Sequence, residues 1–240
     1  MKSIQRIRTL AVFAAAVSGQ AMAQDGAWDW QFTPYLWGAG IDGDVAIGPI
    51  GREVDVDFSE IVDVLAGAAL FRVEGGNDDH GLITDFVWLR LEPEDEIATV
   101  GGVAAAEFDT VMADVGYVRK LDRIDLELGA RYWDFELELD PALLPEIVRD
   151  DNWVDGYVGI RLVREIGSNW LWQTRLNVGA GGSDSTFGAE THFALRFDND
   201  NALVVGFKAL DVDYSNDSVG GTPFVIDTMF LGGTIGFMFD

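Results

Sequence analysis

The chain has 240 residues, of which 48% are hydrophobic, and a formal net charge of −25 at pH 7. That hydrophobic content is high enough to build a folded domain, so the charge does not indicate disorder. The lack of cysteine excludes disulfides, thiol nucleophiles and Cys-bound zinc, and the excess of 41 acidic over 16 basic residues argues against nucleic-acid binding.

Residues 1–23 have the pattern of a secretory signal peptide. Basic residues precede an apolar run over residues 10–17, and the segment ends on Ala21-Met22-Ala23, a small-x-small cleavage site. The run is shorter than the roughly 20 apolar residues of a membrane-spanning helix, so a single-span anchor is the weaker alternative. We predict a cleaved signal over residues 1–23 and a mature domain over residues 24–240. Once three of the 16 basic residues leave with the signal, 13 basic and 41 acidic residues remain.

Beyond the signal, apolar side chains recur with a period of two. Residues 28–37 and 187–198 show this alternation most clearly. The period is that of a β-strand with one apolar and one polar face. The mature sequence contains no long helical periodicity and no run near the roughly 18 apolar residues of a membrane helix, which excludes a bundle of spanning helices.

Turn signals divide the mature chain into ten strands. Short polar breaks lie near residues 77–80, 121–123, 167–169 and 198–200, and they alternate with longer connections near residues 42–65, 93–102, 141–151, 181–185 and 215–222. This order predicts an all-β fold, a closed antiparallel up-and-down transmembrane β-barrel with short periplasmic turns and long outer loops. The alternatives are eight strands, or twelve if residues 45–47 pair with residues 53–57 across Gly48-Pro49-Ile50-Gly51.

Three segments fit this pattern less well. Residues 59–65 could form one or two helical turns, either plugging the mouth of the barrel or lying at its rim. Asp85 interrupts an otherwise apolar run over residues 83–91. Near Trp133 the apolar residues take the opposite parity, which predicts either a β-bulge or the emergence of the strand from the bilayer.

The two strand faces decide between membrane and water. A soluble β-sandwich hides its apolar face and exposes its charges, whereas here ions of both signs share one strand face in mid-strand. We expect the apolar side chains to face lipid and the ions to neutralise one another inside the barrel, because unpaired charges there would be costly. The predicted lumen ion network comprises Arg72, Glu74, Asp114, Glu127, Arg131, Asp155, Arg161, Arg175, Glu190 and Arg196.

Aromatic residues gather near strand ends. Amphipathic rings settle at the level of lipid headgroups, so this placement predicts an aromatic girdle. Its members are Trp28, Trp30, Tyr117, Trp170, Trp172, Phe237 and Phe239.

The last strand carries the sharpest local signal. Residues 228–239 are rich in glycine and end on aromatic residues, and in this they resemble the closing strand by which outer-membrane barrels are recognised for assembly. The entry segment, residues 30–38 (WQFTPYLWG) followed by residues 54–58 (VDVDF), is similar to that of a group of uncharacterised Gram-negative outer-membrane β-barrel proteins, loosely OmpA-like. The resemblance covers the mature chain and implies an architecture and a location, without an agreed activity. It departs from the family in ending on Asp240 after the aromatic Phe239.

Few residues suggest chemistry. His192 lies beside Glu190 and near Ser183 and Ser185 in sequence, so a Ser-His-Glu hydrolase is conceivable. We expect His192 and Glu190 to join the ion network instead. His80 is predicted to be a solvated turn residue.

Two carboxylate pairs, Asp55 with Asp57 and Glu136 with Glu138, could bind a divalent cation. A solvated strand face beside the outer loops explains them better. We therefore predict no metal site, no cofactor and no enzyme activity.

Barrel size bears most directly on function. Ten strands lie close to the eight at which side chains fill the lumen, whereas porins with a water channel need about 16. We predict a monomeric barrel of the cell outer membrane with a filled lumen, structural or surface-interacting, with at most narrow solute passage.

The expected partners are outer-membrane lipid, the assembly machinery through the C-terminal strand, and divalent cations attracted to acidic outer loops at residues 92–96, 140–151 and 211–217. The alternatives are a barrel enzyme that hydrolyses lipid or peptide, a small-solute channel, and a soluble periplasmic β protein.

Overall fold

The computed structural model describes residues 28–47, 50–92, 103–141, 147–216 and 223–240. These residues form a sheet of eleven strands and one short helix. The strands are β1 (Asp29–Ile47), β2 (Ile50–Val56), β3 (Leu65–Gly76), β4 (His80–Leu91), β5 (Val103–Arg119), β6 (Asp125–Pro141), β7 (Ile147–Ile166), β8 (Trp170–Gly181), β9 (Ser185–Arg196), β10 (Ala202–Asn216) and β11 (Phe224–Met238), and the helix is α1 (Phe58–Asp63).

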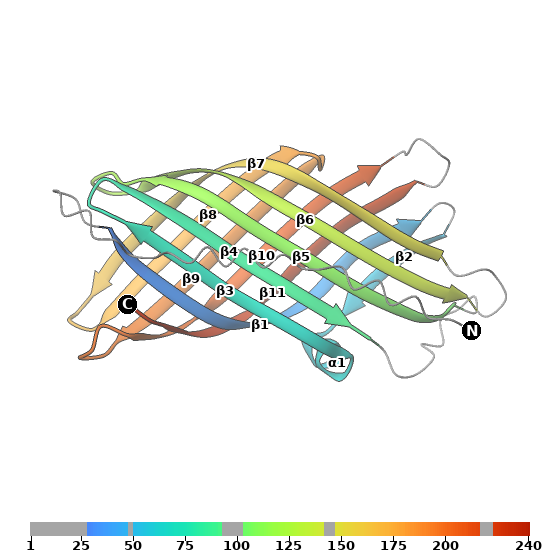
Figure 1. Ribbon diagram of the computed structural model, residues 1–240, viewed down its shortest axis with the longest axis horizontal. Helices are drawn as coiled ribbons and strands as arrows, with labels where there is room; N and C mark the ends of the chain where they lie inside the picture. Colours follow the sequence, from blue (N-terminus) through green and yellow to red (C-terminus); the bar gives the residue numbers. More distant parts are fainter. Residues whose placement is uncertain (1–27, 48–49, 93–102, 142–146, 217–222) are drawn as a thin grey trace.

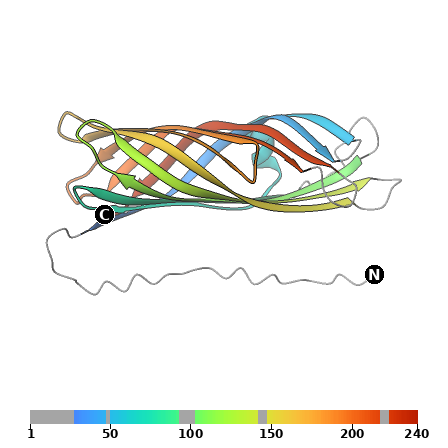
Figure 2. The same ribbon diagram turned by 90° about the horizontal axis from the view of Figure 1, so that it is seen from above.

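The sheet closes on itself. Consecutive strands from β3 to β11 pair antiparallel, and β1 pairs with β3 on one edge and with β11 on the other. Figures 1 and 2 show the resulting barrel, whose wall contains ten strands because β2 lies outside it. The predicted closed up-and-down barrel and its strand number are therefore confirmed. Closure leaves no long free edge along most of the wall, as a hydrocarbon environment requires.

The short connections lie at one end of the barrel. Residues 77–79, 120–124, 167–169 and 197–201 join the strand pairs β3–β4, β5–β6, β7–β8 and β9–β10. The C-terminus lies at the same end (Figure 1). This end corresponds to the periplasmic side that the turn pattern predicted.

The strands extend further at the opposite, outer end than the sequence pattern indicated. β1 runs to Ile47, β7 begins at Ile147 and β10 ends at Asn216, because their pairing continues in register. The acidic residues Asp150, Asp151, Asp211 and Asp213 therefore lie on strands and not in loops, which corrects the prediction. The loop predicted over residues 93–102 lies outside the described residues.

β1 changes partner along its length. It pairs with β3 only over Asp29–Pro34 and with β2 over Ile41–Ile47. Residues 45–47 pair with residues 50–52, and residues 53–56 pair with residues 41–44. This hairpin on β1 adds no strands to the wall, so the twelve-strand alternative is wrong. Between these two pairings, residues 35–40 of β1 and residues 65–70 of β3 have no recorded strand partner on their facing edges.

The helix predicted near residues 59–65 forms at Phe58–Asp63 beside this unpaired stretch (Figure 1). Its N-terminus carries a capping box, in which the Asp57 side chain and the Glu60 side chain each accept a backbone N–H. The Phe58 ring packs against Gly38, 3.4 Å from where a Cβ atom would stand. Because Trp37 and Ala39 point into the core, Gly38 faces outward, so α1 lies at the outer surface of β1 and does not plug the mouth.

The change of pattern near Trp133 is not a bulge. β6 pairs with β7 without a register shift from Asp125 to Leu139. Trp133 and Phe135 therefore point to the same side as Arg131, into the barrel. The alternative expectation, that the strand leaves the bilayer here, fits this geometry.

Candidate functional site

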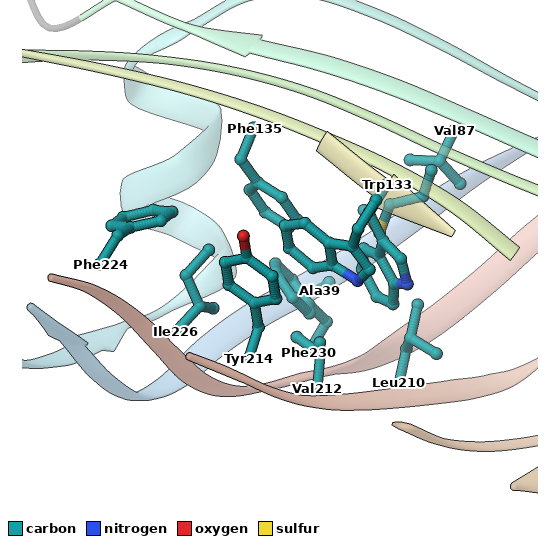
Figure 3. Close-up of a cluster of buried hydrophobic side chains, with 12 residues drawn as sticks. Ala39, Val87, Trp133, Phe135, Leu210, Val212, Tyr214, Phe224, Ile226 and Phe230 are labelled. Carbon is teal, nitrogen blue, oxygen red and sulfur yellow. The ribbon is translucent and has the colours of Figure 1, made fainter. Parts of the chain in front are cut away.

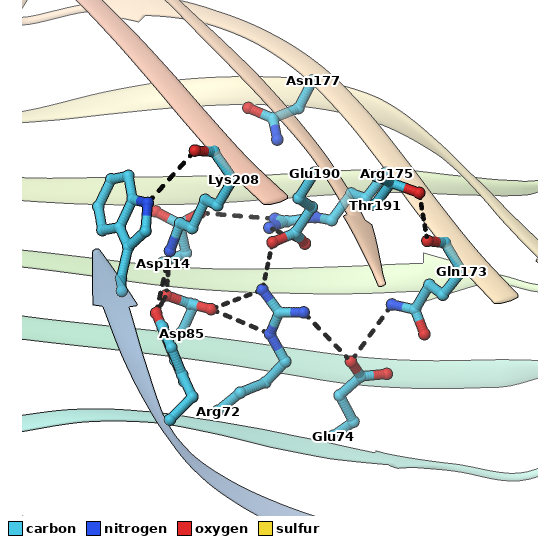
Figure 4. Close-up of polar contacts among 12 residues, drawn as sticks. Arg72, Glu74, Asp85, Asp114, Gln173, Arg175, Asn177, Glu190, Thr191 and Lys208 are labelled. Atoms are coloured by element: carbon cyan, nitrogen blue, oxygen red, sulfur yellow. Dashed lines mark hydrogen bonds and ion pairs between the residues drawn. The ribbon is translucent and has the colours of Figure 1, made fainter. Parts of the chain in front are cut away.

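A network of charged side chains fills the middle of the lumen (Figure 4). In one half Asp85 is the hub: it accepts hydrogen bonds from Arg72 Nε at 2.9 Å, from Lys208 Nζ at 2.7 Å and from the Tyr35 hydroxyl at 2.7 Å. Arg72 also donates to Glu190. These residues come from β1, β3, β4, β9 and β10, so the contacts tie together strands that are not neighbours in the wall.

The other half contains two bidentate pairs. Arg131 donates to both carboxylate oxygens of Asp114, at 2.7 and 2.8 Å. Arg175 donates in the same way to both carboxylate oxygens of Glu127. Its Nη1 also donates to Glu190 at 3.4 Å, and this contact joins the two halves. The Tyr157 hydroxyl donates to Glu127 at 2.6 Å. Fork-to-fork geometry of this kind gives the strongest charge-assisted hydrogen bonds.

The charges in this network balance. Its basic members are Arg72, Arg131, Arg175 and Lys208, and its acidic members are Asp85, Asp114, Glu127 and Glu190. Each side chain is about nine-tenths buried or more. Burial of charge is tolerated when every ion is paired and hydrogen-bonded, and removal of one partner leaves a costly uncompensated ion.

Three predicted members lie toward the periplasmic end. Arg161 donates to Glu74 at 2.7 Å and to Asp125 at 3.1 Å. The Arg196 side chain pairs with Glu165 at 3.3 Å, and 40% of it is exposed. Arg196 therefore belongs to the rim and not to the buried network, because it stands at the end of β9.

Asp155 plays a different part from the one predicted. It is completely buried and has no recorded basic partner among the described residues. Its carboxylate accepts hydrogen bonds from Trp133 Nε1 at 3.0 Å, Trp153 Nε1 at 3.2 Å and the Ser183 backbone N–H at 2.8 Å. Asp155 thus holds two indole rings in place.

The network predicted from the sequence lacks Asp85, Tyr35, Tyr157 and Lys208. In the sequence, Asp85 stands only as an interruption of an apolar face. The cross-strand register aligns Asp85 with Arg72 on one side and Asp114 on the other. A charge at matching register in adjacent strands was the available signal.

An aromatic layer lies on the outer side of the ion network, and Figure 3 shows the buried side chains of this layer. Trp153 stacks on Tyr214 with ring centroids 3.8 Å apart, and it also stacks on Phe135 and Trp133 at 5.5 and 5.8 Å. The buried members of this layer are Ala39, Val87, Met112, Trp133, Phe135, Trp153, Leu210, Val212, Tyr214, Phe224, Ile226 and Phe230. The sequence pattern alone does not predict this layer.

The open space in the lumen narrows from the periplasmic end toward this layer. A vestibule of about 620 Å³ opens between the short turns, where it is lined by Asp79, Lys120 and Arg161. It shares Gln173 and Glu74 with a cavity of about 60 Å³ that reaches Lys208. A space of only about 20 Å³ remains between the network and Leu210 of the aromatic layer.

His192 lines the 60 Å³ cavity and is 9% exposed. Glu190 is engaged by Arg72 and Arg175. Ser185 stands seven residues away on the same strand, about 23 Å at the rise of a β-strand, and Ser183 precedes the strand at the same end. The described residues therefore do not assemble the Ser-His-Glu arrangement that the sequence suggested.

The other candidates for chemistry stay apart. His80 lies at the start of β4, where its ring contacts the Tyr117 hydroxyl and Arg119. Asp55 is exposed on β2 and Asp57 caps α1. Among the described residues there is no group of three or more His, Cys, Asp or Glu side chains that could hold a metal ion.

The outer face of the wall is apolar at the level of the ion network. Exposed fractions reach 68% for Leu36, 61% for Leu128 and 64% for Phe207, while charged side chains at the same level are buried. An apolar exterior around an ionic interior is the reverse of a soluble sandwich and matches a barrel immersed in lipid. The chain is an outer-membrane β-barrel protein. No helix in the described part of the chain is long and apolar enough to cross a membrane.

The predicted girdle residues all lie near the short-turn end of this barrel. Five of them are exposed outward: Trp28, Trp30, Tyr117, Trp170 and Phe239. Phe237 packs between the rings of Phe197 and Phe239, and Trp172 donates its indole N–H to Thr191 at 2.9 Å. The opposite boundary has a different chemistry, since outward acidic residues such as Asp42 and Asp44 follow the apolar band there.

Comparisons with known proteins show similarity in fold alone. No family model and no curated protein matches the sequence. Similar solved structures include Ail, the attachment invasion locus protein of Yersinia pestis (TM-score 0.41, 11% identity, covering 90% of this chain and 100% of that one), and the β domain of the Bordetella autotransporter BrkA (0.36, 9%, 90% and 99%). The Pseudomonas putida toluene transporter TodX is a third (0.28, 11%, 90% and 90%).

Proposed function

We propose that this protein is a non-conducting barrel that acts at the cell surface as a structural or surface-interacting element. In this proposal the signal at residues 1–23 directs export, the C-terminal strand engages the assembly machinery, and the mature chain works as a monomer without enzymatic activity. The observation that carries the proposal is the aromatic layer, which stands between the ion network and the outer end.

Two observations, one on the ion network and one on the aromatic layer, support a closed lumen. Beneath the aromatic layer the charges are paired, so an ion entering from the vestibule finds no uncompensated partner. Within the layer, packed rings offer no hydration to a passing ion. Breaking the ion pairs or displacing the packed rings would cost several kcal/mol.

Surface action is supported by the chemistry of the outer end. Strands continue there beyond the apolar band and carry outward acidic side chains such as Asp134 and Asp211. These carboxylates attract cations within about 8 Å at physiological salt. Divalent cations between this end and anionic headgroups are part of the proposal.

Planar-bilayer recording of the purified protein tests the proposal. We expect no stable conductance steps from the parent protein. The double variant Trp153→Ala/Tyr214→Ala removes the central stacked pair and should introduce steps, whereas the matched double variant Trp30→Ala/Trp170→Ala, on the outer surface, should not. Large, stable steps from the parent protein would reject the proposal in favour of a small-solute channel, to which the vestibule of about 620 Å³ would give access.

A further inference from the structure

Strand β2 has a free edge at the outer end of the barrel. It pairs with β1 over Ile50–Val56 and stands last in the strand order. Among the described residues no strand or recorded backbone hydrogen bond lies on its second edge. A row of unpaired N–H and C=O groups is a template for another extended chain.

The two faces of β2 differ in chemistry. Glu53 and Asp55 are exposed on one face, while Val54 and Val56 on the other are half-buried. A strand added beside β2 would continue both faces, since side chains alternate in the same way along it. The added strand would therefore place every second side chain beside the acidic face and the others beside the valines.

The acidic face of β2 continues across three further strands. Glu53 lies opposite Asp44, Asp44 opposite Asp227, and Asp227 opposite Asp213. Like charges at such positions repel one another, because neighbouring strands are only about 4.8 Å apart. Burial and the neighbouring Asp227 carboxylate together raise the pKa of Asp213. This row lacks a cationic partner among its own members.

We propose that the free edge of β2 binds an extended polypeptide segment in which basic and apolar side chains alternate. Backbone hydrogen bonds provide the pairing, and basic side chains beside Glu53 and Asp55 relieve the repulsion along the carboxylate row. A second copy of this chain is a poor partner for the same edge, because its β2 would bring further carboxylates into the row. The inference rests on the proposed surface location and names the class of partner.

Two peptides of eight residues with alternating lysine and valine provide the test, measured by fluorescence anisotropy on the full-length protein in lipid nanodiscs. One peptide is N-methylated on every lysine and the other on every valine, so that each has a different edge blocked at equal charge. We expect their affinities to differ about tenfold, because antiparallel pairing uses one edge. Equal affinities would show attraction between side chains alone and would overturn the proposal.

Protein variants locate the site. Glu53→Gln/Asp55→Asn should weaken binding of the unmethylated peptide about tenfold, as loss of complementary charge predicts. The matched variant Glu107→Gln/Glu136→Gln removes two exposed carboxylates from β5 and β6, which do not pair with β1 or β2, and should change affinity less than about threefold. Equal losses in both variants, or no binding at all, would overturn the proposal. Neither result would alter the bilayer recording, so the two proposals fail independently.

Discussion

The periplasmic and outer parts of β6 carry opposite chemistry on the same two faces. From Leu126 to Arg131 the inward side chains are ionic and the outward ones are aliphatic, with Leu128 61% exposed. From Trp133 to Leu137 the inward side chains are apolar, and the outward side includes Asp134 and Glu136. The alternation continues without interruption. What changes along β6 is the medium outside the wall, which is lipid around the periplasmic part and water around the outer part.

This comparison shows that strand geometry fixes which side a residue faces, while the surroundings decide which chemistry suits that side. A strand needs only about 9–11 residues to cross a bilayer, and β6 has 17. The excess length forms an outer end that is built like a water-soluble barrel, with an apolar core and a charged surface. The lipid-embedded part has the reverse arrangement.

The largest expected effect is on the buried ion network. Arg175→Met leaves Glu127 as an uncompensated buried carboxylate and should destabilise the barrel by about 3–5 kcal/mol. Urea unfolding in lipid vesicles, followed by the gel mobility of unheated samples, measures the loss. The double variant Arg175→Met/Glu127→Leu should recover much of it.

A matched substitution, Arg196→Met, separates burial from charge. Arg196 makes an exposed pair with Glu165, so its loss should cost no more than about 1 kcal/mol. If both arginine variants lost the same stability, burial in the lumen would not be what makes the loss of Arg175 costly.

The second effect compares two positions on the outward face of β6. Leu128→Arg places a cation in the middle of the apolar band and should cost about 2–4 kcal/mol in lipid. Asp134→Arg on the same face should cost far less, since Asp134 lies beyond Tyr132 toward the outer end. The same unfolding assay in vesicles measures both, and equal costs would place the lipid boundary elsewhere.

A smaller effect concerns the row of carboxylates at the outer end that contains Asp227 and Asp213, and the neighbouring Asp211. Burial and the Asp227 carboxylate raise the pKa values of Asp211 and Asp213. A carboxylate whose folded pKa is raised stabilises the fold below its unfolded pKa, and that contribution is lost as the pH rises through the folded pKa. Asp227→Asn should therefore stabilise the barrel at pH 7 by about 0.2–1 kcal/mol, and the gain should vanish below about pH 4.

Salt and a control position sharpen this test. The gain from Asp227→Asn should shrink in 1 M salt, where the Debye length is about 3 Å. Asp198→Asn, in the exposed turn between β9 and β10, should change stability little at any pH. A gain at Asp227 that is independent of pH and salt would point to a cause other than charge repulsion.

The sequence predicted the wall of this barrel well, because a period of two and short turns are local signals. It also indicated which residues share the lumen, since ions in mid-strand on one face must be paired. It could not place Asp85 as a hub, because the contacts of Asp85 with Tyr35 and Lys208 cross the lumen between strands that do not pair with one another. It took Trp133 as a change of parity, because a single pattern of faces was assumed along the whole strand.

The part of the fold that the sequence predicted least well is the unpaired stretch between β1 and β3, and it leads to the last prediction. Residues 35–40 and 65–70 lie within the apolar band, where Leu36 is 68% exposed, yet their facing edges have no recorded strand partner. Backbone groups without pairing exchange hydrogen faster than ladder groups. We expect the amides of residues 35–40 that point away from β11 to exchange at least about tenfold faster than those of residues 111–116 on β5, a strand that is paired on both sides.

Helix α1 should limit this difference. Phe58 covers Gly38 at the unpaired stretch, so Phe58→Ala should raise exchange at residues 35–40 and leave residues 111–116 unchanged. Hydrogen exchange with mass spectrometry in nanodiscs resolves both segments. Equal protection of the two segments in the parent protein would mean that β1 and β3 pair along their full length in the bilayer, and that the wall is as continuous there as it is between β5 and β6.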